Sequence, residues 1–201
     1  MIKVATLDLD GVYFLDSHEN FKANLLAKYG LTEDKVVPVY FGSQRMVDYK
    51  LGKINGDEFW DWAIKEWGIE ATKEELLRVL AGGYFINDKA KSLMDKLHAQ
   101  GILTAICTNN FLERIKVIDE KLNFLKDFDV KVFSYEAGVA KPDMEIYREL
   151  IRASGVKPDE IVYFDDSEDA VGAAKKLGIR AFFYKGFDEM VEQLKSLGAN
   201  L

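Results

Sequence analysis

Short apolar runs alternate with helical patterns along most of the chain. The first run covers residues 2–7, is rich in β-branched residues and stops at an acidic turn, which is the pattern of a buried strand. Four further runs of this kind predict strands at residues 102–107, 130–134, 161–164 and 181–184. Apolar positions at helical spacing lie between the later runs and predict helices that end near Gly101, Gly155 and Gly178. Strands alternating with helices predict a parallel sheet that is covered on both faces.

The segment between the first two predicted strands has a different pattern. Residues 17–85 contain several apolar stretches at helical spacing and no strand pattern, so we expect an all-helical insert. Trp60, Ile64 and Trp67 share one helix face, because they are spaced i, i+4 and i+7. They could form a ligand-stacking box, but helical spacing alone favours a packed core of the insert. We therefore expect a larger α/β unit (residues 1–16 and 86–201) and a small helical cap (residues 17–85).

The composition is that of an ordinary globular protein, with 48% hydrophobic and 30% charged residues among 201. The formal net charge is -7, and no run of Lys or Arg is present. A nucleic acid is therefore not expected as a partner, because its phosphate backbone selects for a basic face. A small phosphorylated molecule remains a possible partner, since it needs only a local positive charge.

Cysteine usage and hydropathy limit the remaining classes. The single cysteine, Cys107, excludes an internal disulfide framework and a thiolate metal cluster. No apolar stretch approaches membrane-spanning length, and the first residues run directly into a strand instead of a signal-peptide core. We expect a cytoplasmic protein without a membrane partner. The oligomeric state cannot be read from the sequence.

Polar residues follow three of the predicted strands at the point where each strand ends. In an open parallel sheet, ligands bind outside the carboxyl ends of the strands, where the strand order reverses. We therefore predict the strand order 3-2-1-4-5, with the first strand in the middle, because that order brings the polar groups together. These groups are Asp8 and Asp10, Thr108 and Asn109, and Asp165 and Asp166.

The first polar group suits phosphoryl transfer, which needs an in-line nucleophile and positive charge over the equatorial oxygens. Asp8 lies at the strand tip and can attack phosphorus, forming an aspartyl phosphate that divides one difficult displacement into two easier ones. Asp10 follows two residues later, on the same side of an extended chain, and can protonate the leaving alcohol and later deprotonate water. Gly11 permits a sharp exit of the chain. Tyr13 or Phe14 is expected to touch the substrate or the cap.

Several carboxylates cannot lie together without a cation, because like charges raise each other's pKa. Mg²⁺ takes few carboxylates and prefers oxygen ligands, which fits Asp8, Asp166 and the carbonyl of Asp10. Lys141 would add positive charge beside the nucleophile and the phosphoryl group. Thr108 offers a hydroxyl and the backbone donors that follow it to a phosphoryl oxygen.

In order and spacing, these residues resemble the four motifs of the haloacid dehalogenase (HAD) superfamily. The matching segments are Asp8-Leu9-Asp10-Gly11-Val12, Thr108-Asn109, Lys141-Pro142-Asp143 and Phe164-Asp165-Asp166-Ser167. The resemblance spans nearly the whole chain. It implies a Rossmannoid three-layer α/β core that is catalytic and has the nucleophile strand in the centre, and it implies that the helical insert is a first-position cap.

The resemblance also implies roles for individual residues. Asp8 would be the nucleophile and Asp10 the general acid and base. Asp166 would bind magnesium directly, and Asp165 would bind it through water. The phosphoryl group would be bound by Thr108, Asn109 and Lys141. The chain departs from the family at Ala170, where many relatives have Asp or Asn; Asp169 lies one residue earlier, so support for the Asp166 loop is in question.

The function predicted from these residues is a magnesium-dependent phosphatase that hydrolyses a small phosphorylated metabolite. A phosphomutase would use the same residues but protect the aspartyl phosphate from water; the small cap favours hydrolysis. A haloacid dehalogenase would need neither Asp10 nor the Asp165–Asp166 pair, because a halide leaves without a proton. A binding module without catalytic activity would not need the complete set of Asp8, Asp10, Lys141 and Asp166. The substrate itself cannot be read from the sequence.

Five other polar or reactive side chains have weaker claims to a role. His18 and His98 each lack a second metal-binding side chain at a suitable spacing, and both are expected to be exposed helix residues. Cys107 is expected to be a small core residue. Arg45 and Lys50 could face the site and contact the leaving group of the substrate, but the favoured interpretation places both on a solvated helix face.

Overall fold

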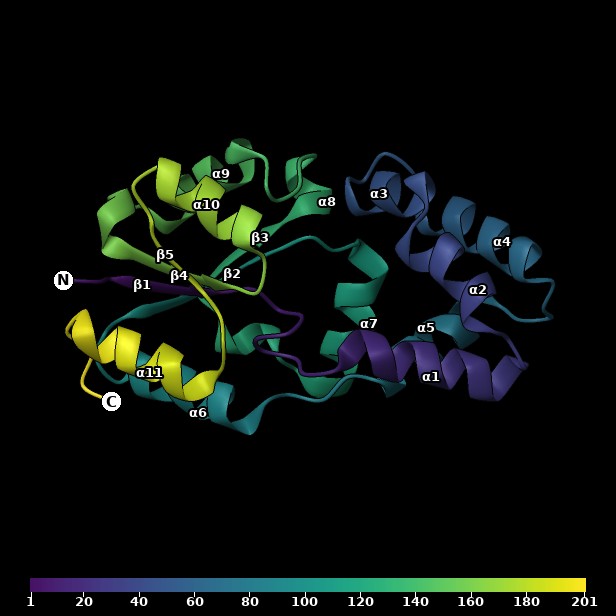
Figure 1. Ribbon diagram of the computed structural model, residues 1–201, viewed down its shortest axis with the longest axis horizontal. Coiled ribbons are helices and arrows are strands. Elements are labelled where there is room, and N and C mark those ends of the chain that lie inside the picture. The colour runs from purple at the N-terminus through teal and green to yellow at the C-terminus, as the bar shows by residue number, and fades with distance from the viewer.

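The computed structural model describes residues 1–201, and its centre is a five-stranded parallel sheet of order β3-β2-β1-β4-β5 (Figure 1). The strands are β1 (Val4–Leu7), β2 (Leu103–Thr108), β3 (Val130–Phe133), β4 (Ile161–Asp165) and β5 (Arg180–Phe183). All four pairings are parallel, and β1 lies between β2 and β4. The predicted strand order and the central position of the first strand are confirmed.

Helices cover both faces of the sheet. Figure 1 shows α9 (Met144–Ser154) and α10 (Glu168–Lys176) on one face, with α6 (Asp88–His98) and α11 (Phe187–Ser196) on the other. Successive side chains of a strand point to opposite faces, so each buried strand contributes to two apolar clusters. In β2, Ala105 and Cys107 pack in the α9 and α10 cluster, whereas Ile106 belongs to the other cluster. The expectation that Cys107 is a core residue is confirmed.

One further helix and three short elements complete the α/β unit. They are α7 (Leu112–Leu122), the 3₁₀ turns η2 (Leu125–Asp127) and η3 (Pro158–Glu160), and α8 (Ser134–Ala137). Helices α7 and α11 were not among the helices predicted from the sequence.

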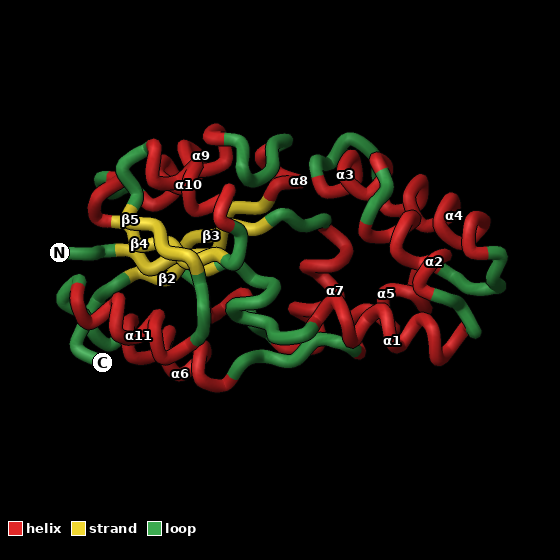
Figure 2. Tube along the Cα trace, viewed as in Figure 1, coloured by secondary structure: helices red, strands yellow, loops and turns green.

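All regular elements between β1 and α6 are helices, and Figure 2 shows no strand there. It contains α1 (Ser17–Tyr29), α2 (Glu33–Val36), the π-helical turn η1 (Val37–Phe41), α3 (Gln44–Lys50), α4 (Gly56–Trp67) and α5 (Lys73–Gly82). Asn55 and Thr72 begin α4 and α5 with reciprocal capping boxes. Trp60 and Trp67 are buried and Ile64 packs against them, so the packed-core interpretation of this face is confirmed. No helix of the chain has both the length and the apolar character needed to cross a membrane.

The helical insert packs directly on the α/β unit. Helix α5 contacts α7, and the ring of Phe111, just before α7, stacks on Tyr49 of α3 with 4.2 Å between ring centroids. The Ser134 hydroxyl of α8 donates a hydrogen bond to the carbonyl of Lys50 at 2.6 Å. The end of α3 is therefore held beside the carboxyl ends of the strands, where the polar residues gather.

Candidate active site

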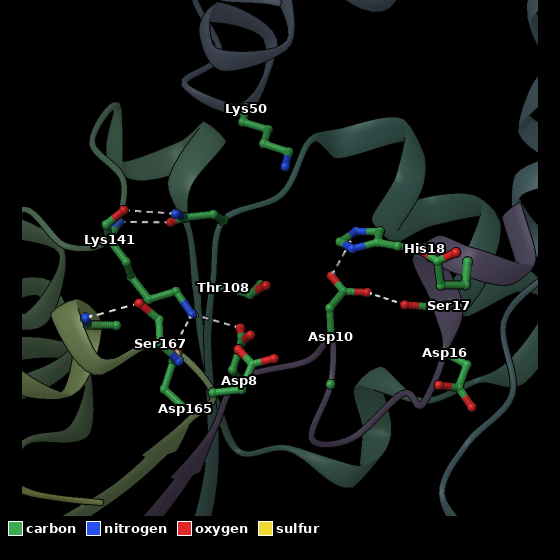
Figure 3. Close-up of a pocket in the computed structure, with 15 residues that line it drawn as sticks. Asp8, Asp10, Asp16, Ser17, His18, Lys50, Thr108, Lys141, Asp165 and Ser167 are labelled. Carbon is green, nitrogen blue, oxygen red and sulfur yellow. Dashed lines mark hydrogen bonds and ion pairs between the residues drawn. The ribbon is translucent and has the colours of Figure 1, made fainter. Parts of the chain in front are cut away.

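A polar cavity of about 480 Å³ lies between the carboxyl ends of the strands and the helical insert (Figure 3). Only one of its 15 lining residues is hydrophobic. A cavity of this size and polarity suits a small, charged ligand. Every site residue predicted from the sequence lines it: Asp8, Asp10, Thr108, Asn109, Lys141, Asp165 and Asp166.

Lys141 joins two carboxylates from neighbouring strand ends. Its ammonium group lies 2.7 Å from Asp8 Oδ1 and 2.6 Å from Asp165 Oδ2. Burial raises the pKa of Asp8 to about 7; the Lys141 charge opposes this rise and the nearby carboxylates of Asp165 and Asp10 add to it. Burial tends to lower the pKa of Lys141, but Asp8 and Asp165 raise it well above its usual range, so Lys141 stays charged. One ammonium group therefore lies between two buried carboxylates and cannot neutralise both, so the site keeps an excess of negative charge.

Asp166 adds a third carboxylate to this corner of the cavity. One carboxylate oxygen from each of Asp8, Asp165 and Asp166 lies within 4.8 Å of the other two. Gly11 makes this approach possible: its φ is +80°, and a Cβ there would overlap the Asp166 carboxylate. Converging oxygen ligands with excess negative charge fit a hard divalent cation such as Mg²⁺.

The loop that carries Lys141 is held by the end of β2. The Asn109 side-chain amide donates to the Lys141 carbonyl at 2.9 Å, and its oxygen accepts from the Lys141 backbone N–H at 2.8 Å. The Asn109 side chain thus fastens this loop. Thr108 is buried and lines the cavity.

Asp10 lines the cavity, but Figure 3 shows its carboxylate pointing towards His18 and Ser17, away from the Asp8–Lys141 pair. Arg114 Nη2 lies 2.6 Å from both Asp10 oxygens, and the Ser17 hydroxyl donates to Oδ1 at 2.6 Å. Tyr84 donates to the same oxygen at 3.3 Å. Burial favours a higher pKa, but the Arg114 charge, together with smaller contributions from neighbours such as the Ser17 hydroxyl, outweighs it and holds the pKa of Asp10 well below its usual range.

Arg114 contributes to the site through Asp10, although no motif of the sequence predicts it. Its side chain is 1% exposed, and its Nε and Nη1 groups are buried without a hydrogen-bond partner. A signal exists in the sequence: Phe111, Ile115 and Ile118 form the buried face of α7, and Arg114 lies on that face. A charged residue on the apolar face of a helix indicates a buried partner.

Lys50 and His18 also line the cavity, which corrects two expectations. Lys50 was expected on a solvated face, yet Figure 3 shows its side chain entering the cavity from the insert. It follows the buried residues Met46 and Tyr49 on α3, so its position near the buried side was visible in the spacing. His18 is part-exposed, but it lies 3.9 Å from Asp10. Arg45 matches the expectation, because it lies at the surface over the ring of Trp62.

The remaining expectations concern residues around the acidic loops. Asp169 is exposed and does not line the cavity, whereas Ala170 does, so Asp169 does not replace the missing polar side chain. Tyr13 and Phe14 are both buried. Phe14 packs edge-on against Tyr84, at the end of the helical insert, with 5.3 Å between ring centroids.

The family follows from a comparison with known proteins. The sequence profile described as haloacid dehalogenase-like hydrolase matches residues 2–178. The chain belongs to the haloacid dehalogenase-like hydrolases. The resemblance seen in the four motifs is thereby confirmed.

Individual relatives cover the chain in part or match it only in fold. A phosphorylated carbohydrates phosphatase of Thermotoga maritima is 32% identical over 114 residues, which are 55% of this chain and 51% of that protein. A phosphatase of Mycobacterium tuberculosis is 31% identical over 138 residues, 64% of this chain and 62% of the relative. This chain therefore spans between half and two thirds of these two relatives. A HAD family enzyme of Bacteroides thetaiotaomicron superposes with a TM-score of 0.78 at 22% identity, covering 96% of this chain and 98% of that one; the same enzyme has been solved with magnesium and inorganic phosphate.

Proposed function

We propose that this protein is a magnesium-dependent phosphatase that hydrolyses a small phosphate monoester through an aspartyl phosphate on Asp8. The observation that carries the proposal is the Lys141 ammonium group, which bridges Asp8 and Asp165 at 2.7 and 2.6 Å beside the third carboxylate, Asp166. A nucleophilic carboxylate, a fixed positive charge and a set of hard oxygen ligands are the parts that phosphoryl transfer requires. The phosphatase names of two partial relatives agree with this set.

The chain's own residues have distinct tasks in this reaction. A carboxylate oxygen of Asp8 forms a bond to phosphorus while the ester P–O bond breaks. Lys141 holds Asp8 in place and balances charge on the phosphoryl oxygens, and Thr108 with the backbone after it donates hydrogen bonds to them. Mg²⁺, held by Asp8, Asp166 and the carbonyl of Asp10, with Asp165 acting through water, would neutralise the remaining negative charge.

Asp10 moves the protons in both halves of the reaction. Its carboxyl group gives a proton to the departing alkoxide, and its carboxylate then takes one from the water that attacks the aspartyl phosphate. Water adds to phosphorus, the bond to Asp8 breaks, and inorganic phosphate leaves. Because Arg114 holds Asp10 ionised, the first step requires that this contact weaken when the substrate enters. Substrate binding would therefore change the Asp10–Arg114 pair before bond cleavage.

Hydrolytic dehalogenation is less consistent with the site. A halide needs no proton, so a dehalogenase has no use for Asp10 as an acid. It would equally have no use for a cluster of carboxylates suited to Mg²⁺. A phosphomutase uses the same groups, and no feature of the cavity favours it over hydrolysis.

The test compares Asp166→Asn with Asp169→Asn. Both replace an Asp of the same loop and helix start, but only Asp166 lines the cavity. Release of phosphate from para-nitrophenyl phosphate is measured over a series of Mg²⁺ concentrations and in EDTA. We expect the wild type and Asp169→Asn to turn over only with Mg²⁺. Asp166→Asn should need much more Mg²⁺ for the same rate.

Two results would contradict the proposal. Turnover that persists in EDTA would remove the metal from the mechanism. Release of halide from a 2-haloacid, with no phosphate release from any ester, would place the protein with the dehalogenases instead. Quenching in acid and detecting a phosphorylated protein in the wild type, and none in Asp8→Asn, would test the covalent step separately.

A further inference from the structure

Lys50 is a cation in the cavity that no carboxylate neutralises. The other two cations of the site are paired: Lys141 with Asp8 and Asp165, and Arg114 with Asp10. The Lys50 side chain lines the cavity but forms neither an ion pair nor a hydrogen bond. Burial, together with the Arg114 charge, lowers the pKa of Lys50 to about 8, so it still carries a positive charge at neutral pH. An ammonium group in this position is costly unless an anion approaches it.

The position of Lys50 is set by the α/β unit. Its carbonyl accepts a hydrogen bond from the Ser134 hydroxyl at 2.6 Å, and the same hydroxyl bonds to the backbone of Asn110, two residues after Thr108. A Cβ at Gly52 would overlap the backbone of Tyr135, so the turn after α3 also packs closely on this unit. The end of α3 therefore holds Lys50 over the cavity, and the charge is in place before a substrate arrives.

Lys50 enters the cavity from the side opposite Asp8 (Figure 3). The phosphoryl group must lie against Asp8 and Lys141, so the leaving group of the ester extends from there towards the insert. His18, the other cavity residue near this end, already lies beside Asp10 and Arg114. Lys50 is thus the one charged donor of the insert that can meet the leaving group.

We propose that Lys50 binds a second anionic group on the substrate, so that the preferred substrates are phosphate monoesters whose leaving group carries a carboxylate or a second phosphate. This inference rests on the proposed phosphatase function and makes its substrate class specific. The cavity supports it, because nearly all of its lining is polar and a flat apolar leaving group would find no surface to pack on.

The test uses pairs of esters in which one member carries a second anionic group and the other has a neutral group in its place. One arm compares 2-phosphoglycolate with its neutral amide, and the other compares propane-1,3-diol bisphosphate with 3-hydroxypropyl phosphate. The variants are Lys50→Met, which keeps the length of the side chain, and Lys53→Met as a matched control. Lys53 lies in the same segment, but its side chain is 61% exposed and does not line the cavity.

For the wild type we expect a higher kcat/KM for the charged member of at least one pair. Lys50→Met should lower that value ~10- to 100-fold, the usual worth of a hydrogen bond to a charged group, and change the neutral member less than about threefold. Lys53→Met should behave as the wild type. The arm that responds tells whether the second group is a carboxylate or a phosphate.

Two outcomes would overturn the inference, and they differ from each other. Equal slowing of charged and neutral esters by Lys50→Met, or no wild-type preference in either arm, would show that Lys50 acts on the phosphoryl group or on the fold. In that case para-nitrophenyl phosphate would still be hydrolysed and the phosphatase function would stand. No turnover of any ester, para-nitrophenyl phosphate included, would overturn the proposed function and this inference with it.

Discussion

The ion pair between Arg114 and Asp10 is largely buried, and Arg114→Met removes it with little change in side-chain volume. Arg114 is 1% exposed and the Asp10 side chain 16%, and one guanidinium nitrogen lies 2.6 Å from both carboxylate oxygens. After the substitution, the Asp10 carboxylate keeps only the hydroxyl donors of Ser17 and Tyr84. A buried charge would then lack its counter-charge.

Removing one partner of a buried ion pair typically costs about 3–5 kcal/mol. In a chain of this size, 1 kcal/mol corresponds to a change in Tm of roughly 2–4 °C, so Arg114→Met should lower Tm by roughly 6–20 °C. The loss depends on pH. Arg114 depresses the pKa of Asp10 against the effect of burial, so the stabilisation is present above the ordinary value of 3.8 and is lost as the pH falls below it. The difference between the two proteins should therefore persist from pH 7 to about pH 4 and shrink as the pH falls further.

The measurement is urea or thermal unfolding in EDTA, as a double-mutant cycle with Asp10→Asn. The double variant has no unpaired charge, so its loss should be smaller than the sum of the single losses by ~1–3 kcal/mol. Arg148→Met is the matched control, since the Arg148–Glu145 pair is half-exposed on α9 and should contribute under about 1 kcal/mol. Additive losses in the cycle, or a fall in Tm no larger than that of the control, would refute the account of Asp10 as a carboxylate held by Arg114.

Three further substitutions test the roles of individual site residues. Asp8→Asn should abolish turnover and leave the circular dichroism spectrum unchanged, because the amide cannot act as nucleophile; near wild-type activity would exclude the covalent route. Asp10→Asn should slow the first half-reaction of an alkyl phosphate ~100- to 10,000-fold in rapid-quench experiments and that of an activated aryl phosphate much less; equal slowing would remove Asp10 from the acid role. Lys50→Met should raise Tm at pH 7 in the absence of substrate, because lowering the Lys50 pKa from 10.5 to about 8 corresponds to roughly 3 kcal/mol of lost stability. This loss of stability is fully present below pH 8 and disappears above pH 10.5. A fall in Tm at pH 7 would mean that Lys50 supports the fold.

The strand order and the grouping of the acidic residues were predictable because both depend on short-range pattern. A buried strand shows itself as a continuous apolar run, and a polar residue directly after it must lie at the carboxyl edge of the sheet. Asp8, Thr108 and Asp165 are fixed in this way by their strands, which pair side by side in the structure. Helices α7 and α11 were not predicted, and neither is preceded by a side chain that caps its first turn, since Phe111 and Gly186 hold those positions.

The roles of Asn109 and Lys50 depended on contacts that no local pattern describes. Asn109 was expected to bind phosphate, and the structure shows its side chain holding the Lys141 backbone from 32 positions away in the chain. Lys50 was expected in solvent, but the hydrogen bond from Ser134 to its carbonyl spans 84 positions. The first contact joins two loops of the α/β unit. The second depends on how the insert packs on that unit, through α3 against α8 and α5 against α7.

The central strand, the carboxylates at the strand ends and Lys141 were all predictable from local pattern, because each is tied to a strand end or to a motif of neighbouring residues. The electrostatic state of the site depends instead on the packing of distant segments. Arg114 comes from α7, Lys50 from α3 and Asp10 from the loop after β1, and they interact because three separate elements meet at one cavity. Charge interactions depend on distance and burial in space, and neither quantity is contained in the spacing of residues along the chain.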